Sequence, residues 1–223
     1  MIKILGSFIL LGFLLIFLTL NTSSTRLGSG FLIGQELHVF TYYNLVKEAE
    51  IIKVKFPNED DIAADIVFHD STQNIAILEL QESPKVKREP LVLSREGIGR
   101  RTESVFTLGY PWTNTMEDKH NLLEGSASNI SELIELNLLI GPVHSGSPLF
   151  NNHNEVVGML LFNAHAKLTI PEKQSHHVAI PKTLLDKALK AARVNIIAHE
   201  VKGLSREAFI NKSKNNIVLI EAT

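Results

Sequence analysis

Short apolar runs, separated by turn-forming or charged residues, recur along most of the chain. They indicate β-strands, because they are too short for helices and are rich in Val, Ile, Phe and Leu. The runs cover residues 30–33, 37–40, 51–56, 63–68, 75–80, 105–108, 133–140, 148–150, 156–162 and 178–180. So many short strands without helices between them predict an all-β fold, a sandwich or a pair of barrels, because a parallel sheet needs a helix after each strand.

The last part of the chain departs from this strand pattern. Residues 182–192 carry apolar side chains at helical spacing, and Pro181 suits the first turn of a helix there. Beyond them the pattern is strand-like at 194–201, helix-like at 205–211 and strand-like at 217–221. About thirty residues are too few for an independent domain. We therefore expect residues 193–223 to be an appendage packed on the main domain.

The N-terminal segment is a single apolar block over residues 4–20, preceded by Lys3. At 1.5 Å per residue such a helix is about 26 Å long, against a hydrocarbon core of about 30 Å. We expect residues 1–24 to be a membrane anchor that forms a transmembrane helix, with a cleaved signal peptide as the alternative. Lys3 favours a cytoplasmic N-terminus. The rest of the protein would then be extracytoplasmic, periplasmic in a bacterium, or secreted if the segment is cleaved.

Composition and charge exclude several classes of function. The chain has 22 Lys and Arg against 24 Asp and Glu, a formal charge of -2, and its basic residues form no stripe, which argues against nucleic-acid binding. It has no Cys, which excludes disulfides, thiolate nucleophiles and thiolate metal sites. Its His residues show no metal-ligand spacing. We expect no metal and no cofactor, and a nucleophile can only be Ser, Thr, Lys or a carboxylate.

A turn-rich bend at residues 143–150 carries the main candidate for chemistry. It reads Val-His-Ser-Gly-Ser-Pro-Leu-Phe and leads into an apolar strand, so it can present the hydroxyl of Ser145. A serine becomes a nucleophile only if a base removes its proton and backbone N–H groups receive the developing oxyanion. Taken alone, the bend is weak evidence for catalysis.

From residue 28 to about 192 the chain resembles trypsin-like serine proteases, and most closely the HtrA (Deg) family. The motifs follow in the family's order: Gly-Ser-Gly-Phe at 28–31, Val-Phe-Thr-Tyr-Tyr-Asn-Leu-Val at 39–46, Asn-Ile-Ala-Ile-Leu at 74–78, Leu-Gly-Tyr-Pro at 108–111, Ser-Gly-Ser-Pro-Leu at 145–149, Val-Val-Gly-Met at 156–159 and His-Val-Ala-Ile-Pro at 177–181. The resemblance implies two six-stranded antiparallel β-barrels over residues 25–192, with the site in the cleft between them.

The departures from the family pattern fall on the catalytic positions. The resemblance places Ser145 at the nucleophile, Asn44 at the catalytic His and Asn74 at the catalytic Asp. An Asn amide has no basic nitrogen, so the position of the general base is empty. The implied oxyanion hole uses the N–H groups of Ser145 and of Val143, where the family has Gly. A β-branched residue is poorly suited to orienting that peptide.

The family comparison also assigns the pocket and the tail. His176, His177 and Val178 fall on a wall of the specificity pocket. Residues 193–223 resemble the start of the PDZ domains that follow HtrA proteases. Since a PDZ domain needs about 90 residues, a complete peptide groove cannot be present in them.

These observations predict a catalytically inactive HtrA-like homologue, a pseudoprotease whose function is binding. Its partner would be unfolded or extended polypeptide along the cleft, or a protein partner such as an active relative in a homo- or hetero-oligomer. One alternative is an active serine hydrolase in which Ser145 uses an atypical base such as His176 or His177. A second alternative is a degenerate gene product with no selected activity.

Overall fold

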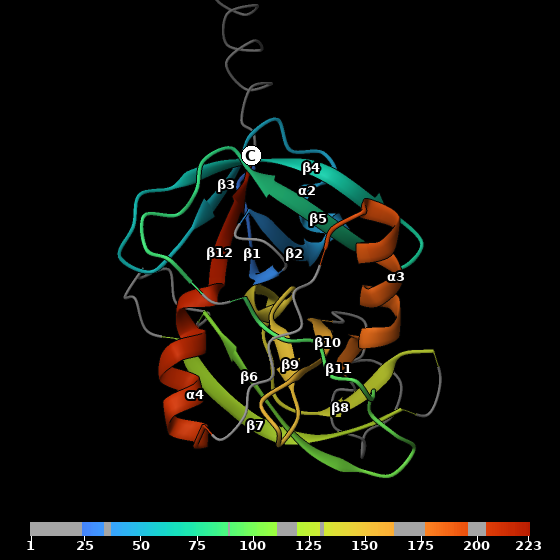
Figure 1. Cartoon of the computed structure of the whole chain (residues 1–223). Helices are drawn as coiled ribbons and strands as arrows, with labels where there is room; N and C mark the ends of the chain where they lie inside the picture. The colour runs from blue at the N-terminus through green and yellow to red at the C-terminus, as the bar shows by residue number, and fades with distance from the viewer. Residues whose placement is uncertain are drawn as a thin grey trace, which may run out of the picture.

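The computed structural model describes residues 24–33, 37–88, 90–110, 120–129, 132–162, 177–195 and 204–223. Within these residues the strands form two closed six-stranded barrels with antiparallel pairing, one above the other in Figure 1. The prediction of an all-β fold with two six-stranded barrels is therefore confirmed.

The first barrel contains the N-terminal strands. Around the barrel the strands follow the order β1 (Arg26–Ile33), β12 (Ile217–Ala222), β3 (Ile52–Lys55), β4 (Ile62–Asp70), β5 (Ile75–Leu80) and β2 (His38–Tyr42). A one-turn helix, α2 (Tyr43–Val46), follows β2 directly. Alternate side chains of the strands fill the interior, including Leu32, Val54 and Leu78, as the two-residue period of a strand requires.

The second barrel is built from the middle of the chain. Its strands follow the order β10 (Val156–Leu161), β11 (His177–Pro181), β8 (Ile134–Asn137), β7 (Asn121–Asn129), β6 (Glu103–Gly109) and β9 (Pro148–Phe150). The connections and the C-terminal part add η1 (Pro142–His144), α3 (Lys182–Ala192), α4 (Arg206–Ser213) and η3 (Lys214–Asn216). The helix predicted at 182–192 is confirmed with the same bounds.

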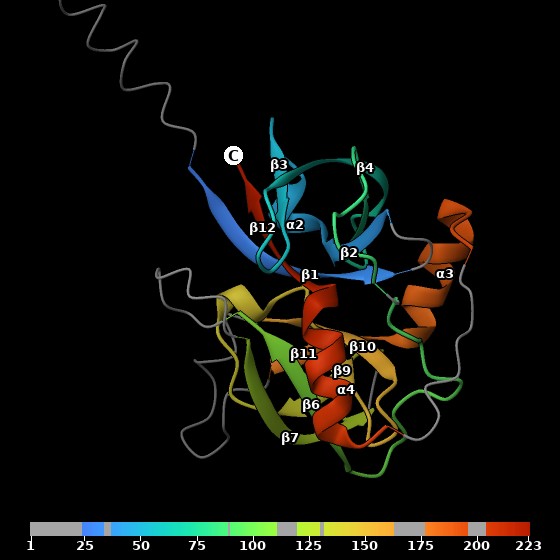
Figure 2. The same cartoon turned by 60° about the vertical axis from the view of Figure 1, so that its left-hand side comes forward.

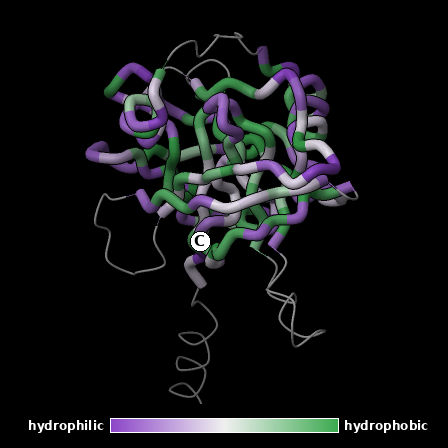
Figure 3. The backbone as a smooth tube through the Cα atoms, turned by 90° about the horizontal axis from the view of Figure 1, so that it is seen from below, coloured by the Kyte–Doolittle hydropathy of each residue, from purple (hydrophilic) through white to green (hydrophobic). Residues whose placement is uncertain are grey.

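A hydrophobic core between the barrels holds them together. Phe31 and Phe40 of the first barrel lie in one cluster with Phe106 and Phe150 of the second barrel and Leu185 of α3. The ring centroids of the first pair lie 5.5 Å apart and those of the second pair 5.0 Å apart. Hydrophobic segments of the backbone gather in the interior (Figure 3). Burial of each such side chain contributes about 1.5–3 kcal/mol, so this core fixes the relative position of loops from both barrels.

The C-terminal residues contact both barrels. Strand β12 pairs antiparallel with β1 on one side and with β3 on the other. Helix α4 lies against the second barrel (Figure 2), where the ring of Phe209 packs on those of Phe106 and Phe150. This arrangement differs from the appendage expected for residues 193–223 and from a barrel domain that ends at residue 192. The reason is that β12 is buried over 217–220 and supplies one of the six strands that close the first barrel.

Two strands of the second barrel differ from the sequence prediction. Strand β7 was not predicted, because its nine residues include a single buried position and therefore show little apolar pattern. Strand β8 covers only Ile134–Asn137 of the predicted 133–140. The strand-like stretch 194–201 is not a strand at 194–195, and its remaining residues lie outside the described part of the chain.

The apolar block at residues 4–20 lies outside the described residues. In the part of the chain that the structure covers, no helix combines the length and the hydropathy needed to cross a bilayer.

Candidate active site

Two successive turns before β9 form the bend that carries Ser145: the Ser145 N–H donates to the Pro142 carbonyl, and the Ser147 N–H donates to the His144 carbonyl. Pro142 opens the 3-10 turn η1, and the turn ends at Ser145, whose backbone has φ -58° and ψ 132°. Gly146 follows with φ +89°, a conformation that favours glycine. A Cβ on Gly146 would lie 1.9 Å from the carbonyl oxygen of Ser29 on β1. The glycine therefore allows the bend of the second barrel to pack directly on the backbone of the first.

All three polar groups of Ser145 make hydrogen bonds within the protein. The N–H of Phe162 donates to Ser145 Oγ at 2.9 Å. The Ser145 N–H donates to the carbonyl of Pro142 at 3.0 Å, and the Ser145 carbonyl accepts from the N–H of Ser29 at 2.9 Å. Ser145 is only 4% exposed. The hydroxyl thus has a backbone N–H as its partner.

The residues at the implied His and Asp positions lie next to each other. The backbone N–H of Asn44, on α2, donates to Asn74 Oδ1 at 2.8 Å. Asn74 has φ 56°, a left-handed conformation that Asn tolerates better than most residues, and its carbonyl accepts from the N–H of Tyr43 at 3.2 Å. In the described part of the chain no hydrogen bond joins either asparagine to Ser145. The structure therefore brings Asn44 and Asn74 together and places an amide at each position.

Backbone groups at the implied oxyanion hole also make hydrogen bonds within the protein. The carbonyl of Val143 accepts a hydrogen bond from Ser29 Oγ at 2.7 Å. Because the Ser145 N–H points to the Pro142 carbonyl within the turn, one of the two N–H groups of the hole already has an acceptor. An oxyanion hole needs donors that face the developing charge. In this conformation Ser145 does not offer its N–H to a ligand.

Two histidines are buried at the bend, His144 within it and His177 on β11. His144 Nδ1 accepts a hydrogen bond from the N–H of Gly141 at 3.1 Å, so the neutral ring carries its proton on Nε2. His177, on β11, stacks on the ring of Phe162 with centroids 5.2 Å apart. Burial lowers the pKa of both imidazoles; at His144 the hydrogen bond with the backbone of Gly141 opposes this shift and His177 adds to it. Burial thus favours the neutral form of both rings, and His144 uses Nδ1 within the turn.

The remaining candidates of the pocket wall are only partly covered. Val178 pairs with Glu135 of β8 and with Leu161 of β10, so it lies within the sheet between these two strands. His176 lies outside the described residues. The described residues contain no group of three or more His, Asp or Glu side chains placed to hold a metal ion.

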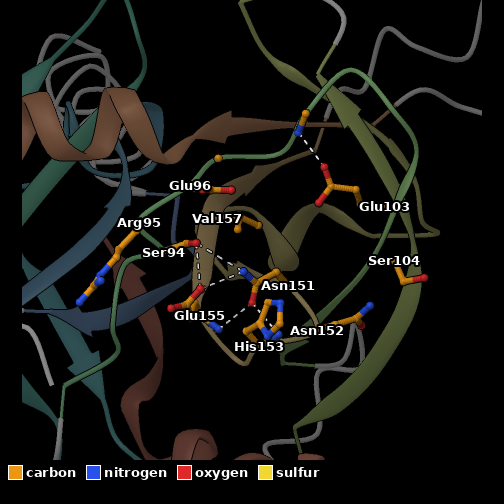
Figure 4. A pocket seen from close by; sticks show the side chains of 12 residues that line it. Ser94, Arg95, Glu96, Glu103, Ser104, Asn151, Asn152, His153, Glu155 and Val157 are labelled. Carbon is orange, nitrogen blue, oxygen red and sulfur yellow. Dashed lines mark hydrogen bonds between the residues drawn. The ribbon is translucent and has the colours of Figure 1, made fainter. Parts of the chain in front are cut away.

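A polar cavity of about 630 Å³ lies on the second barrel, and the sequence did not predict it. On its wall Glu155 Oε2 accepts hydrogen bonds from Ser94 Oγ at 2.9 Å and from Asn151 Nδ2 at 3.1 Å (Figure 4). The segment that carries Ser94 runs beside β10, where its N–H donates to the carbonyl of Val156. The cavity combines acidic, basic and amide side chains, and none of the residues of the bend lines it.

Sequence reasoning also missed the partners of the bend. Ser29 stands inside a recognised motif, but its bond to Val143 spans 114 residues of chain. The partner of the Ser145 hydroxyl is a backbone N–H, that of Phe162, and a backbone group leaves no residue-specific mark in a sequence. The one available signal was the Gly-Ser-Gly-Phe motif itself, which places a small polar residue on a buried strand.

The double barrel with a serine-bearing bend defines the class of trypsin-like peptidase folds. The sequence profile described as "Trypsin-like peptidase domain" matches residues 28–159, which is more than half of the chain. The chain therefore belongs to the trypsin-like peptidase domain family. A solved structure, the serine endoprotease from Yersinia pestis, superposes with a TM-score of 0.61 at 20% identity, covering 75% of this chain and 57% of that one. That likeness shows a shared fold.

Curated relatives place the chain beside the HtrA/Deg proteases. It is 26% identical over 144 residues to the protein y4bJ of Sinorhizobium fredii (62% of this chain, 22% of that protein). It is 27% identical over 141 residues to a probable periplasmic serine endoprotease DegP-like of Pseudomonas putida (60% and 28%). It is 23% identical over 141 residues to Protease Do-like 1, chloroplastic, of Arabidopsis thaliana (59% and 32%). The chain spans less than a third of the length of these relatives, and its fold is that of the HtrA family.

Proposed function

We propose that this protein is a catalytically inactive HtrA-like homologue that binds polypeptide or a protein partner. The observation that carries the proposal is that asparagines stand at the positions which the family comparison assigns to the base and its acidic partner. The structure brings them together, with the backbone N–H of Asn44 bonded to Asn74 Oδ1 at 2.8 Å. An amide cannot take up a proton from a serine. In serine proteases with a Ser-His-Asp triad, loss of the base alone costs on the order of a million-fold in turnover. Loss of the acidic partner as well adds little, because the triad acts as a unit.

The surroundings of Ser145 support the same proposal. Its hydroxyl accepts the Phe162 N–H, and its own N–H is directed to Pro142. A serine nucleophile needs the opposite arrangement, with a base as the acceptor for its proton and free N–H groups for the oxyanion. We infer that Ser145 has a structural role, since its hydroxyl satisfies a backbone donor that would otherwise lack this acceptor.

Binding is the activity that such a fold retains without chemistry. The relatives named as proteases act on polypeptides, and we propose that this protein recognises extended polypeptide or a protein partner without cleaving it. The name of the Pseudomonas relative describes it as periplasmic. Together with the apolar block at residues 4–20, this supports a proposed extracytoplasmic location with an N-terminal membrane anchor.

A fluorophosphonate probe tests the loss of chemistry directly, because it labels only activated serines. The full chain is treated in mild detergent beside Ser145→Ala and a matched control, Ser71→Ala, which removes an exposed serine from the turn after β4. We expect no labelling of any of the three proteins. Stoichiometric labelling that persists in Ser71→Ala and disappears in Ser145→Ala would overturn the proposal.

Such labelling would instead favour the serine hydrolase with an atypical base. Among the described histidines, His177 is the candidate for that base, because it stacks on Phe162, the residue whose N–H contacts Ser145 Oγ. A His177→Gln variant of the labelled protein decides the assignment. Loss of labelling in this variant would identify His177 as the base.

A further inference from the structure

Ser29, on strand β1 of the first barrel, makes three contacts with the bend of the second barrel. Its hydroxyl donates to the Val143 carbonyl at 2.7 Å. Its N–H donates to the Ser145 carbonyl at 2.9 Å. Its carbonyl oxygen lies against Gly146, so close that a Cβ added to Gly146 would be only 1.9 Å from this oxygen. These contacts join two segments that are 114 residues apart in the chain, so they form only when both barrels are folded.

Ser29 is itself held in place by its own barrel. Thr41 Oγ1, on the neighbouring strand β2, donates to the Ser29 carbonyl at 2.9 Å. Both residues are fully buried. Strand β1 is paired on both sides, with β2 and with β12. Movement of Ser29 would break several buried hydrogen bonds at once, which is costly. Ser29 is therefore held rigidly enough to hold the bend in one position.

We propose that Ser29 is a positioning residue that locks the bend with the Ser145 N–H turned toward the Pro142 carbonyl. Each peptide group is planar, so fixing the Val143 carbonyl fixes the orientation of the whole peptide between Val143 and His144. The Ser145 N–H belongs to the next peptide, between His144 and Ser145. This peptide lies between the Val143 carbonyl and the Ser145 carbonyl, which accept hydrogen bonds from the Ser29 hydroxyl and the Ser29 N–H. Because it is held on both sides, the Ser145 N–H remains within the 3-10 turn. It then cannot turn toward a carbonyl or an oxyanion placed beside Ser145.

This inference rests on the proposed function, because it describes how the site is held in a non-catalytic conformation. It also predicts which ligands would have to break the lock, that is, the hydrogen bond between the Ser29 hydroxyl and the Val143 carbonyl. A polypeptide that placed a carbonyl oxygen against the Ser145 N–H would first have to break the bond between Ser29 and Val143. A ligand that contacts the cleft without such a carbonyl would leave the lock intact.

Amide hydrogen exchange of the full chain tests the lock without any substrate. The variant Ser29→Ala removes the hydroxyl donor and leaves the Val143 carbonyl without it. The matched control is Thr107→Val, which removes another buried hydroxyl that donates to a backbone carbonyl at 2.7 Å, that of Pro148. Exchange of the Ser145 amide is measured by NMR relative to the amide of Ile77, a buried residue of β5.

We expect Ser29→Ala to speed exchange of the Ser145 amide about tenfold relative to the Ile77 amide, equivalent to about 1.4 kcal/mol. Thr107→Val should leave this ratio unchanged. A merely structural role of Ser29 would raise exchange at both amides alike. The proposal is overturned if Ser29→Ala changes the ratio no more than Thr107→Val does.

A second variant covers the case in which Ser29→Ala does not fold. Ser29→Cys keeps nearly the same size with a weaker donor, and we expect a smaller rise of the same ratio. An unchanged ratio in folded Ser29→Cys would likewise overturn the proposal. None of these readouts depends on the reactivity of Ser145, so failure of the lock and failure of the proposed inactivity are observed separately.

Discussion

Replacement of Ser145 by alanine should destabilise the protein, whereas replacement of Ser147 should not. The two serines lie two residues apart in the same bend, and both are buried. Ser145 Oγ accepts the Phe162 N–H at 2.9 Å. Ser147 Oγ, in contrast, is buried without a hydrogen-bond partner among the described residues. The same atom is deleted in both variants, so they differ mainly in the hydrogen bond that is lost.

The magnitude follows from the cost of a buried donor that loses its acceptor. In Ser145→Ala the Phe162 N–H is left without its acceptor, which costs about 1–3 kcal/mol. For a chain of this size the melting temperature should fall by about 2–12 °C. In Ser147→Ala an unsatisfied hydroxyl is removed, so the free energy of unfolding should stay constant or rise by up to about 1 kcal/mol.

Urea unfolding of the full chain in mild detergent, followed by far-UV circular dichroism, measures both variants against the unchanged protein. Equal unfolding midpoints for the two variants would refute the structural role of Ser145. A Ser145→Ala variant more stable than Ser147→Ala would refute it more strongly, because that order is expected for a serine held in place for catalysis.

Three further predictions concern the site, the C-terminal segment and the buried histidines. The double variant Asn44→His with Asn74→Asp should gain little peptidase activity on a general peptide substrate. Adding Val143→Gly should raise turnover by up to roughly a hundred- to a thousand-fold, which is the effect of one oxyanion donor. Equal activity of the two folded variants would show that Val143 does not disturb the oxyanion hole. Phe209→Ala should lower the free energy of unfolding by about 3–5 kcal/mol, because the ring is 3% exposed and packs on two phenylalanines of the second barrel; a loss below about 1 kcal/mol in thermal unfolding would contradict this packing. Burial lowers the pKa of His144, so the unfolded chain binds more protons than the folded chain, and the free energy of unfolding should fall as the pH drops below about 6.5. Between pH 8 and pH 5, the urea midpoint of His144→Gln should fall less than that of the unchanged protein. An identical fall would assign the effect to other groups.

Local pattern was sufficient for most of the elements. A short apolar run bounded by turn-forming or charged residues is a property of each strand by itself, so the strands at 75–80 and 148–150 could be recognised without knowledge of their partners. The helix Lys182–Ala192 was predicted with its observed bounds, because Pro181 marks its start and the helical spacing marks its face. Strand β7 lacked such a pattern, since its side chains are largely outside the core.

At the candidate site, the sequence shows the residue types, whereas only the structure shows their hydrogen-bond partners. The residue types at Asn44, Asn74 and Ser145 are visible in the sequence, and with them the absence of a base at the position that the family comparison assigns to it. The bond between Asn44 and Asn74 and the partner of Ser145 Oγ are not visible, because each depends on a turn or a backbone group far away in the chain.

The sequence by itself determined the all-β class, the positions of most strands and the chemistry that the side chains of the bend can offer. Only the tertiary structure decided that β12 lies between β1 and β3, that Ser29 holds the bend and that the Ser145 N–H is turned to Pro142. The physical reason is the range of the interactions. Apolar periodicity acts between neighbours in the sequence, whereas strand pairing and buried hydrogen bonds join residues that only the closed barrels bring together.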